Sequence, residues 1–299
     1  MSLYNSGGSG LDEAQVQALI DASASPGIDT IATGIAADVN QDQGNATPLV
    51  SVVSIIATCA TADDAVLAPA ATAGAEFEVL NNGAAVLAVF PASGDNFTRL
   101  SANAATYVNV NQRKRWRCNV EGTWVTISPE VIGQSSDVTL TDFPEIRISP
   151  PMLAIDTIRM SGSYSNYATG ASSVNLAINQ DKTAANYQGG NEYHTRSTTT
   201  VAGSADNTQP SVAAVIASKD SHWEGTVGLS VDGSLACMFT ETKNVDDAAS
   251  SVRATERRHI TKAGADLSAG ITHLQVIGQL ASAMLKSRQV IEIIRGAAA

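Results

Sequence analysis

Short apolar runs bounded by turn-forming residues are the feature that most constrains the fold of this chain. Leu49–Ile56 and Phe77–Leu80 are two such runs, and both are typical of buried strands. Asn81-Asn82-Gly83 follows the second run. An Asn-Gly pair between apolar runs predicts a tight hairpin, because both residues tolerate a positive φ. We therefore expect a small β-module over residues 49–129, and its further strands are Ala84–Phe90, Thr106–Val110, Arg113–Val120 and Thr123–Ile127.

The composition agrees with a mainly β fold. Only 16% of the residues are charged and 5% are aromatic, while alanine, serine, threonine, glycine and asparagine abound. That mixture suits β-rich, fibre-like assemblies better than long helices. Hydrophobic residues make up 44% of the chain and are spread along it in short runs, so the sequence does not resemble a disordered one.

The C-terminal part, residues 130–299, is predicted to be a jelly-roll-like β-sandwich. A linker, Gly133–Ser136, is expected to lead into it. Eight to ten candidate strands alternate with turn clusters, and no clear helical stretch interrupts them. The expected strands are Ile155–Tyr164, Ser173–Ile178, Glu192–Val201, Val212–Ser218, His222–Val231, Leu235–Thr240, Val252–Ile260, Ile271–Ile277 and Gln289–Ile294.

The N-terminal residues 1–48 are interpreted as an arm followed by a short helical anchor or stalk. Leu11–Ser23 is predicted to be a helix, because Val16, Leu19 and Ile20 form one apolar stripe and acidic residues occupy its first turn. A helix of this length is marginal alone and needs a partner surface. Pro26-Gly27 ends it.

A second helical pattern runs from Ile28 to Val39, with isoleucine at positions 28, 31 and 35. Isoleucine at both a-type and d-type positions favours a three-stranded coiled coil. Gly34 and Asp38 interrupt the pattern, so a short helix packed on its own domain is the alternative. The candidate trimer and anchor residues are Val16, Leu19, Ile20, Ile28, Ile31 and Ile35.

The net charge of −11 is concentrated in the first third of the chain. Eleven acidic residues precede the first basic residue, Arg99, and the remainder is balanced. Such a segment repels nucleic acid and anionic membranes, and it suits a basic protein partner. No apolar run approaches the length of about 20 residues that a membrane-spanning helix needs, and the first residues do not resemble a signal peptide. We expect a soluble protein made in a cytoplasm.

The three cysteines, Cys59, Cys118 and Cys237, show no spacing typical of zinc sites or disulfide scaffolds. Buried thiols are the expected state, because free cysteine is among the most buried residue types. A pair between Cys59 and Cys118 on neighbouring strands is the alternative.

The basic run from Arg113 to Arg117 superficially resembles a nucleic-acid patch. On a strand, however, successive side chains point to opposite faces, so Trp116 and Cys118 should lie inside. Arg113, Arg115 and Arg117 should then line the outer face, as a solvated or partner-facing row.

No catalytic, cofactor or metal site is predicted. Asp38, Asn40, Asp42 and Gly44 imitate a calcium loop, but the glycine is one position late and no bidentate glutamate follows. His222 and Glu224 could share one strand face, although polar residues on strands usually face solvent. Five aromatic residues of the C-terminal part could form a sugar-binding platform or pack in a core or trimer interface; they are Tyr164, Tyr167, Tyr187, Tyr193 and Trp223.

Four segments of the β-module resemble a module found in bacteriophage virion surface proteins, including head fibres, head decoration proteins and tail fibres. The matching residues are the LAPA-to-AG segment at Leu67–Gly74, NNGA at Asn81–Ala84, VFPASGD at Val89–Asp95 and EGTW at Glu121–Trp124. The C-terminal part resembles the jelly rolls of such proteins in the order of YQGGNEYHTR, GLSVDGSLACMF and IEIIRG.

This resemblance implies a non-enzymatic structural protein on the virion surface, synthesised in the bacterial host cytoplasm. The expected form is a homotrimeric capsid head fibre or decoration protein that contacts other virion proteins through its acidic N-terminal segment. A tail fibre that attaches to host surface glycans is the alternative, and a polysaccharide depolymerase is a third reading. Nucleic acid and membrane insertion are not expected.

Overall fold

A computed structural model of the chain describes residues 31–138, 145–166, 172–181, 187–194, 199–202, 211–215, 220–230, 234–247, 250–262, 267, 269–278 and 284–296. The protein is mainly β, as the short apolar runs predicted, and no helix occurs among these residues. The predicted helix Leu11–Ser23 lies outside the described residues.

The N-terminal half, which we call the β-module, contains two sheets. The six-stranded sheet has the order β1-β3-β5-β9-β10-β7, and the four-stranded sheet has the order β2-β4-β6-β8. The strands of the first are β1 (Ile31–Ala36), β3 (Val53–Thr58), β5 (Glu76–Asn81), β9 (Gln112–Val120), β10 (Thr123–Thr126) and β7 (Asn96–Phe97). Those of the second are β2 (Thr47–Pro48), β4 (Ala65–Leu67), β6 (Leu87–Phe90) and β8 (Thr106–Val108).

The first six strands form three successive coils that alternate between the two sheets. β1, β3 and β5 are parallel in one sheet, and β2, β4 and β6 are parallel in the other. The hairpin predicted at Asn81–Gly83 is therefore wrong, because β5 and β6 belong to different sheets. The Asn81 amide instead forms a corner: it donates to the Ala85 and Val108 carbonyl oxygens at 2.9 and 3.0 Å and accepts from the Gly83 N–H at 2.9 Å.

The second predicted helix, Ile28–Val39, is wrong from Ile31 onward, because that stretch forms β1. Its parallel pairing with β3 supplies hydrogen-bond partners for backbone N–H and C=O groups, which in a helix would have bonded within the segment. β1 and β2 are thus integral to the β-module, so its described part begins at Ile31 and not at the predicted boundary, Leu49.

An aromatic cluster fills the space between the two sheets of the β-module. The ring centroids of Phe77 and Trp116 lie 4.6 Å apart in a stacked arrangement, and Trp124 meets Phe77 edge-on, also at 4.6 Å. All three side chains are fully buried. Cys59 and Cys118 are buried in the same core as free thiols, and Cys237 is a buried free thiol in the C-terminal half, as predicted.

The C-terminal half is a sandwich of two antiparallel sheets with one core between them. The larger sheet has the order β11-β22-β13-β18-β19-β20-β15-β16, and the smaller has the order β12-β21-β14-β17. The larger contains β11 (Glu130–Val138), β22 (Met284–Ile294), β13 (Thr157–Asn166), β18 (Asp220–Leu229), β19 (Leu235–Asp247), β20 (Ser250–Lys262), β15 (Tyr187–His194) and β16 (Thr199–Ala202). The smaller contains β12 (Ile146–Met152), β21 (Ile271–Gly278), β14 (Ser172–Ile178) and β17 (Ser211–Val215).

Most strands predicted for this half are present, with shifted ends. The expected linker Gly133–Ser136 is wrong, since these residues lie inside β11 and pair with β22. The polar and glycine residues of this segment give no apolar run, so the sequence did not predict a strand here. Its inner face carries the buried Ile132. The predicted strand Glu192–Val201 contains the end of β15 and most of β16, which pair with each other.

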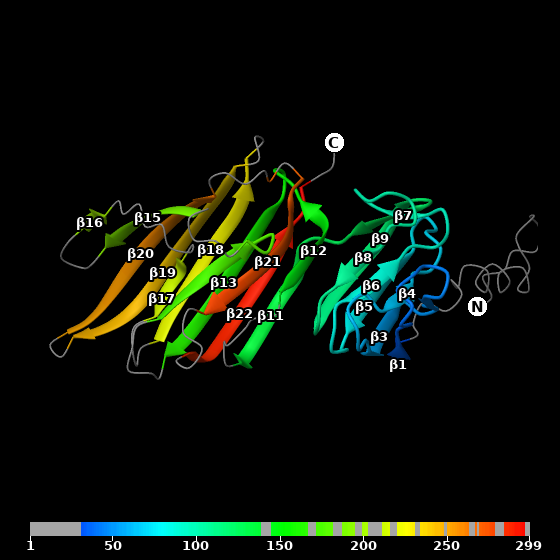
Figure 1. Ribbon diagram of the computed structural model, residues 1–299, viewed down its shortest axis with the longest axis horizontal. Coiled ribbons are helices and arrows are strands. Elements are labelled where there is room, and N and C mark those ends of the chain that lie inside the picture. Colours follow the sequence, from blue (N-terminus) through cyan, green and yellow to red (C-terminus); the bar gives the residue numbers. More distant parts are fainter. Residues whose placement is uncertain are drawn as a thin grey trace, which may run out of the picture.

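The two halves lie side by side along the long axis of the molecule (Figure 1). β9 contacts β11, and β8 contacts β12, so these two strands of the β-module face the near end of the sandwich. β1 and β3 lie on the far side of β5 from β9. This arrangement creates a polar junction between the halves.

Candidate functional site at the junction of the two halves

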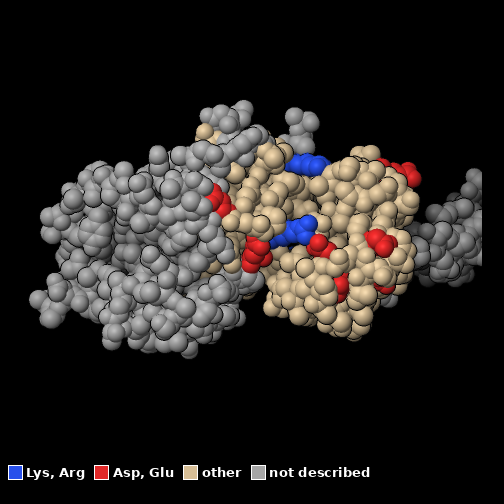
Figure 2. Space-filling model, in the orientation of Figure 1, with Lys and Arg blue, Asp and Glu red and all other residues tan. Residues whose placement is uncertain are grey.

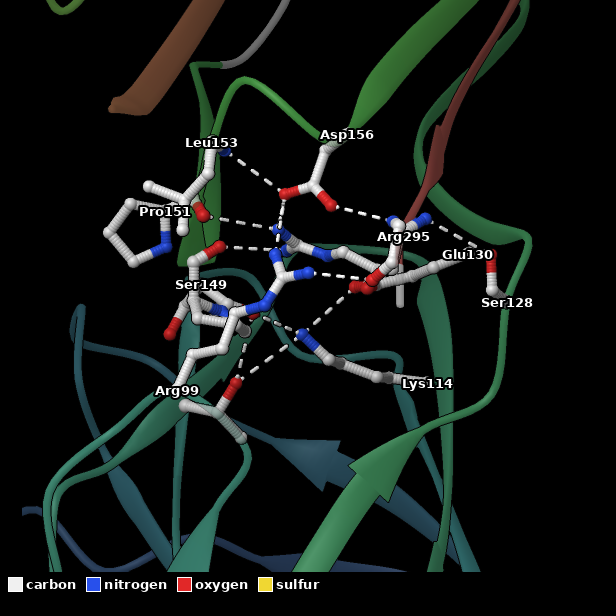
Figure 3. A network of polar contacts seen from close by, with 12 residues as sticks. Arg99, Lys114, Ser128, Glu130, Ser149, Pro151, Leu153, Asp156 and Arg295 are labelled. Atoms are coloured by element: carbon white, nitrogen blue, oxygen red, sulfur yellow. Dashed lines mark hydrogen bonds and ion pairs between the residues drawn. The ribbon is translucent and has the colours of Figure 1, made fainter. Parts of the chain in front are cut away.

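Lys114 is the centre of the junction. Inward and outward residues alternate along β9, and this alternation places the Lys114 side chain on the buried side with Trp116. Its ammonium group lies 2.9 Å from a carboxylate oxygen of Glu130, at the start of β11, and it donates to the Ser149 carbonyl oxygen at 2.6 Å. The buried cation is therefore compensated by groups from the other half of the molecule (Figure 3).

A second cluster surrounds Asp156, whose side chain is fully buried. Arg99 of the β-module donates to this carboxylate at 2.7 Å, and Arg295 of the sandwich lies 3.3 Å from the same oxygen. Arg99 also donates to the Gly296 carbonyl oxygen at 2.7 Å, and the Gly296 N–H donates to Asp156 at 2.8 Å. One aspartate thus joins arginines from both halves (Figure 3).

The conformation of Arg99 helps to direct it across the junction. Its φ of 69° lies in the left-handed region, which costs free energy for a residue with a side chain. The side chain is only 13% exposed, because the ion pair with Asp156 and the bond to Gly296 hold it in place. These contacts offset the backbone cost.

A third set of contacts links β12 to β8 and a nearby turn. The Arg147 guanidinium lies 3.4 Å from the ring centroid of Tyr107 and 2.6 Å from an oxygen of Asp63. The Asn109 amide donates to the carbonyl oxygens of Ile132 and Arg147 and accepts from the Arg147 N–H. These directional bonds fix the relative orientation of the two halves.

Burial and ion pairing oppose each other in the ionisation of this network. Burial lowers the pKa of Lys114, and the neighbouring Glu130 carboxylate partly restores it. Burial also opposes the charge of Asp156, but bonds from Arg99 and from the Leu153 and Gly296 N–H groups bring its pKa below the ordinary value. The contacts around Asp156 thus favour its ionised carboxylate.

A cleft of about 350 Å³ opens beside the network. Arg99 and Arg295 line it, together with Ser128 and Pro150. The Ser128 hydroxyl oxygen accepts from the Arg295 N–H at 3.2 Å. Figure 2 shows basic side chains where the two halves meet, with acidic side chains directly beside them. The charges of the junction are therefore mixed, as the ion pairs require.

The sequence-predicted anchor residues lie away from this junction or outside the described chain. Val16, Leu19, Ile20 and Ile28 belong to the undescribed N-terminal residues. Ile31 is 65% exposed on β1, and Ile35 packs against the core of the β-module. Because β1 is three strands from β9, neither isoleucine takes part in the junction.

The prediction for the basic run on β9 is confirmed. Arg113, Arg115 and Arg117 line the outer face, while Trp116 and Cys118 are buried. Glu78 pairs with Arg113 at 3.0 Å, and Glu76 pairs with both Arg115 and Arg117. Bonds from Arg117 and Arg115 lower the pKa of Glu76.

Sequence reasoning missed the junction residues Lys114, Arg99, Asp156 and Arg295. The alternation that placed Trp116 inside also places Lys114 inside, so that signal was present in the sequence. The other three residues come from distant segments and carry no local pattern. Their meeting depends on the packing of the two halves.

The other predicted polar sites form no second cluster. His222 and Glu224 are exposed on β18, and Trp223 between them is fully buried, so it belongs to the core. Asp38 and Asp42 accept hydrogen bonds within polar turns, from Asn40 and Asn45 respectively. Over the described ranges, no group of three or more histidine, cysteine, aspartate or glutamate side chains is arranged to hold a metal ion.

The outer face of the larger sheet of the sandwich contains a groove of about 450 Å³. Arg159, Glu224 and Glu292 line it together with the hydroxyl-bearing Ser161. Met238 is 51% exposed and supplies part of its apolar surface.

No family model matches the chain, and no curated protein matches it. In the part of the chain that the structure describes, no helix is both long and apolar enough to cross a membrane.

Proposed function

We propose that this chain is a structural protein of a bacteriophage virion surface, most simply a homotrimeric head fibre or capsid decoration protein. The observation that carries the proposal is the junction, where buried ion pairs and hydrogen bonds join two β-structured halves. A surface projection needs a fixed orientation between its attached and outward parts, and a directional network supplies it.

The strand order of the C-terminal half supports the jelly-roll assignment within this proposal. Without the insertions β15–β16 and β19–β20, eight strands remain. In chain order, the larger sheet then contains the first, eighth, third and sixth strands, and the smaller contains the second, seventh, fourth and fifth. This double Greek-key order is that of a jelly roll, an architecture used by viral capsid proteins.

The resemblance of the β-module to modules of phage surface proteins motivates the virion assignment. Its residues now have structural roles: Asn81 forms the corner between two coils, and Trp124 closes the aromatic core. Such a module is a spacer with a folded interior. In the proposed arrangement, the acidic N-terminal segment contacts other virion proteins and the jelly roll projects outward.

A labelled antibody against this chain, applied to intact phage particles, tests the proposal in the electron microscope. Label distributed over the heads supports the head fibre or decoration role. Label confined to tails would replace it with the tail-fibre role. Disrupted particles are labelled as well, so that a hidden epitope is detected. Absence of label from both intact and disrupted particles would overturn both roles.

The groove on the outer face of the larger sheet favours the tail-fibre alternative. Hydroxyl, carboxylate and guanidinium groups beside the apolar Met238 can bind the hydroxyl groups and carbon faces of a glycan. Attachment of the purified protein to host cells should then fall after Arg159→Ala and Glu292→Ala together. Unchanged attachment by this double variant would exclude the groove as a receptor site.

A further inference from the structure

The outer face of the six-stranded sheet carries an apolar band, which we define as Ile31, Val53, Ile55 and Leu80. Ile31 lies beside Val53, and Ile55 lies beside Leu80, so these side chains share one face across β1, β3 and β5. Ile31 is 65% exposed and the other three are partly exposed. The band is continuous across three strands.

An arginine row, Arg113, Arg115 and Arg117, continues this face on β9. Leu80 lies beside Arg113, and the three guanidinium-bearing side chains are 54–63% exposed. Glu76 and Glu78 are their paired carboxylates, so the row has three cations for two anions. The face therefore presents an apolar surface next to a positive excess.

The opposite face of the same sheet packs on the core of the β-module. Ile56, Val79 and Trp116 point inward from β3, β5 and β9 and are fully buried. Within the described ranges, the apolar band is not part of that core. A partly exposed band of this kind is typical of an interaction surface.

Residues 11–23 have the chemistry that complements this face. Val16, Leu19 and Ile20 form an apolar stripe, and Asp12, Glu13 and Asp21 supply negative charge without any lysine or arginine. A helix over this segment would bury its stripe only against another surface. Its acids would meet the positive excess of the arginine row.

Chain geometry allows the segment to reach the face from its own β1. A 13-residue helix is about 20 Å long. The three strand-to-strand steps from β1 to β9 span about 14 Å. Residues 24–30 join the segment to Ile31 and can extend over about 23 Å. This short tether gives the segment a high effective concentration at the face.

We propose that residues 11–23 dock as an amphipathic helix on the outer face of the six-stranded sheet of their own chain. The apolar stripe covers the apolar band, and the acidic residues lie toward the arginine row. The docked helix forms an outer layer over the sheet. This property belongs to the free chain and does not depend on the virion assignment.

Hydrogen exchange of the full-length protein tests the docking. Amides of residues 11–23 should exchange at least about tenfold more slowly than in the isolated peptide, because the docked helix must detach and unfold before its amides can exchange. Arg115→Glu with Arg117→Glu should remove most of this protection. The matched control is Arg159→Glu, an exposed arginine of the sandwich, which should leave it unchanged.

A second variant, Leu19→Ser, changes only the segment and leaves every described residue intact. It should remove the protection of residues 11–23 without altering the thermal unfolding of the β-sheets by circular dichroism. Exchange of the wild-type segment at the rate of the free peptide would overturn the proposal. Protection that rises with protein concentration would also overturn it, because the occupant of the face would then come from a second copy.

Discussion

Lys114 and Glu130 form a buried ion pair across the junction, with 2.9 Å between the ammonium nitrogen and the nearest carboxylate oxygen. Lys114 belongs to the β-module and Glu130 begins the first strand of the sandwich. Their side chains are 2% and 7% exposed. Each charge is therefore compensated by the opposite half of the molecule.

Lys114→Met should destabilise the protein by about 3–5 kcal/mol, because it leaves the Glu130 carboxylate buried without its partner. Urea unfolding followed by tryptophan fluorescence measures this change. The double variant Lys114→Met with Glu130→Gln removes both charges and should be more stable than the single variant. Equal stabilities for the single and double variants would contradict the proposed role of the pair.

Asp156 should make folding stability depend on pH in the acidic range. Its pKa in the folded protein is below the ordinary value of 3.8, so its contribution is present above that value. The contribution is lost as the pH falls through the lowered pKa, because protonation breaks the ion pairs with Arg99 and Arg295. Asp156→Asn should be less stable at neutral pH, and its free energy of unfolding should fall less steeply on acidification.

Gly83 should not tolerate a side chain. A Cβ at this position would lie 2.5 Å from the Cβ of Cys59, on the neighbouring coil. Gly83→Ala should therefore cost about 1–3 kcal/mol through overpacking. Gly44→Ala is the control, because its nearest neighbour would be an Asp42 oxygen at 3.4 Å. Calorimetric melting should show a clear loss for the first variant and little change for the second.

Truncation should distinguish the arm from the β-module. A chain beginning at Ile31 should keep the cooperative thermal unfolding of both halves, since every described strand is retained. A chain beginning at Leu49 lacks β1 and β2, the edge strands of the two sheets, so β3 and β4 become edge strands in their place. Its melting temperature should be lower, and equal melting of the two chains would show that the first coil contributes nothing.

The proposed homotrimer should have three times the chain mass of 30.9 kDa. Light scattering coupled to size-exclusion chromatography measures this mass directly. A coiled coil through Ile31 and Ile35 no longer supports the trimer, since both lie in β1. A stable monomer at micromolar concentration would contradict the homotrimeric form of the proposed function.

Local periodicity determined much of what could be predicted from the sequence. The alternation along β9 correctly separated the outer arginines from Trp116 and Cys118, because successive strand residues always point to opposite faces. Short apolar runs likewise revealed β5, β13 and β18. The same periodicity failed at Ile31 and Ile35, where a spacing of four residues suggested one face of a helix. In β1 an irregular register instead leaves Ile31 exposed and turns Ile35 toward the core.

Tertiary structure alone decided which strands pair and which charges meet. An Asn-Gly turn permits a hairpin, but β5 and β6 do not pair with each other. β5 pairs with β3 in one sheet, and β6 pairs with β4 in the other. Lys114 acquires its counter-charge from Glu130, and Arg99 reaches Asp156, only when the two halves pack together. A buried charge is stable only beside a partner of opposite charge. Here that partner comes from a distant part of the sequence, so only the tertiary structure brings the two together.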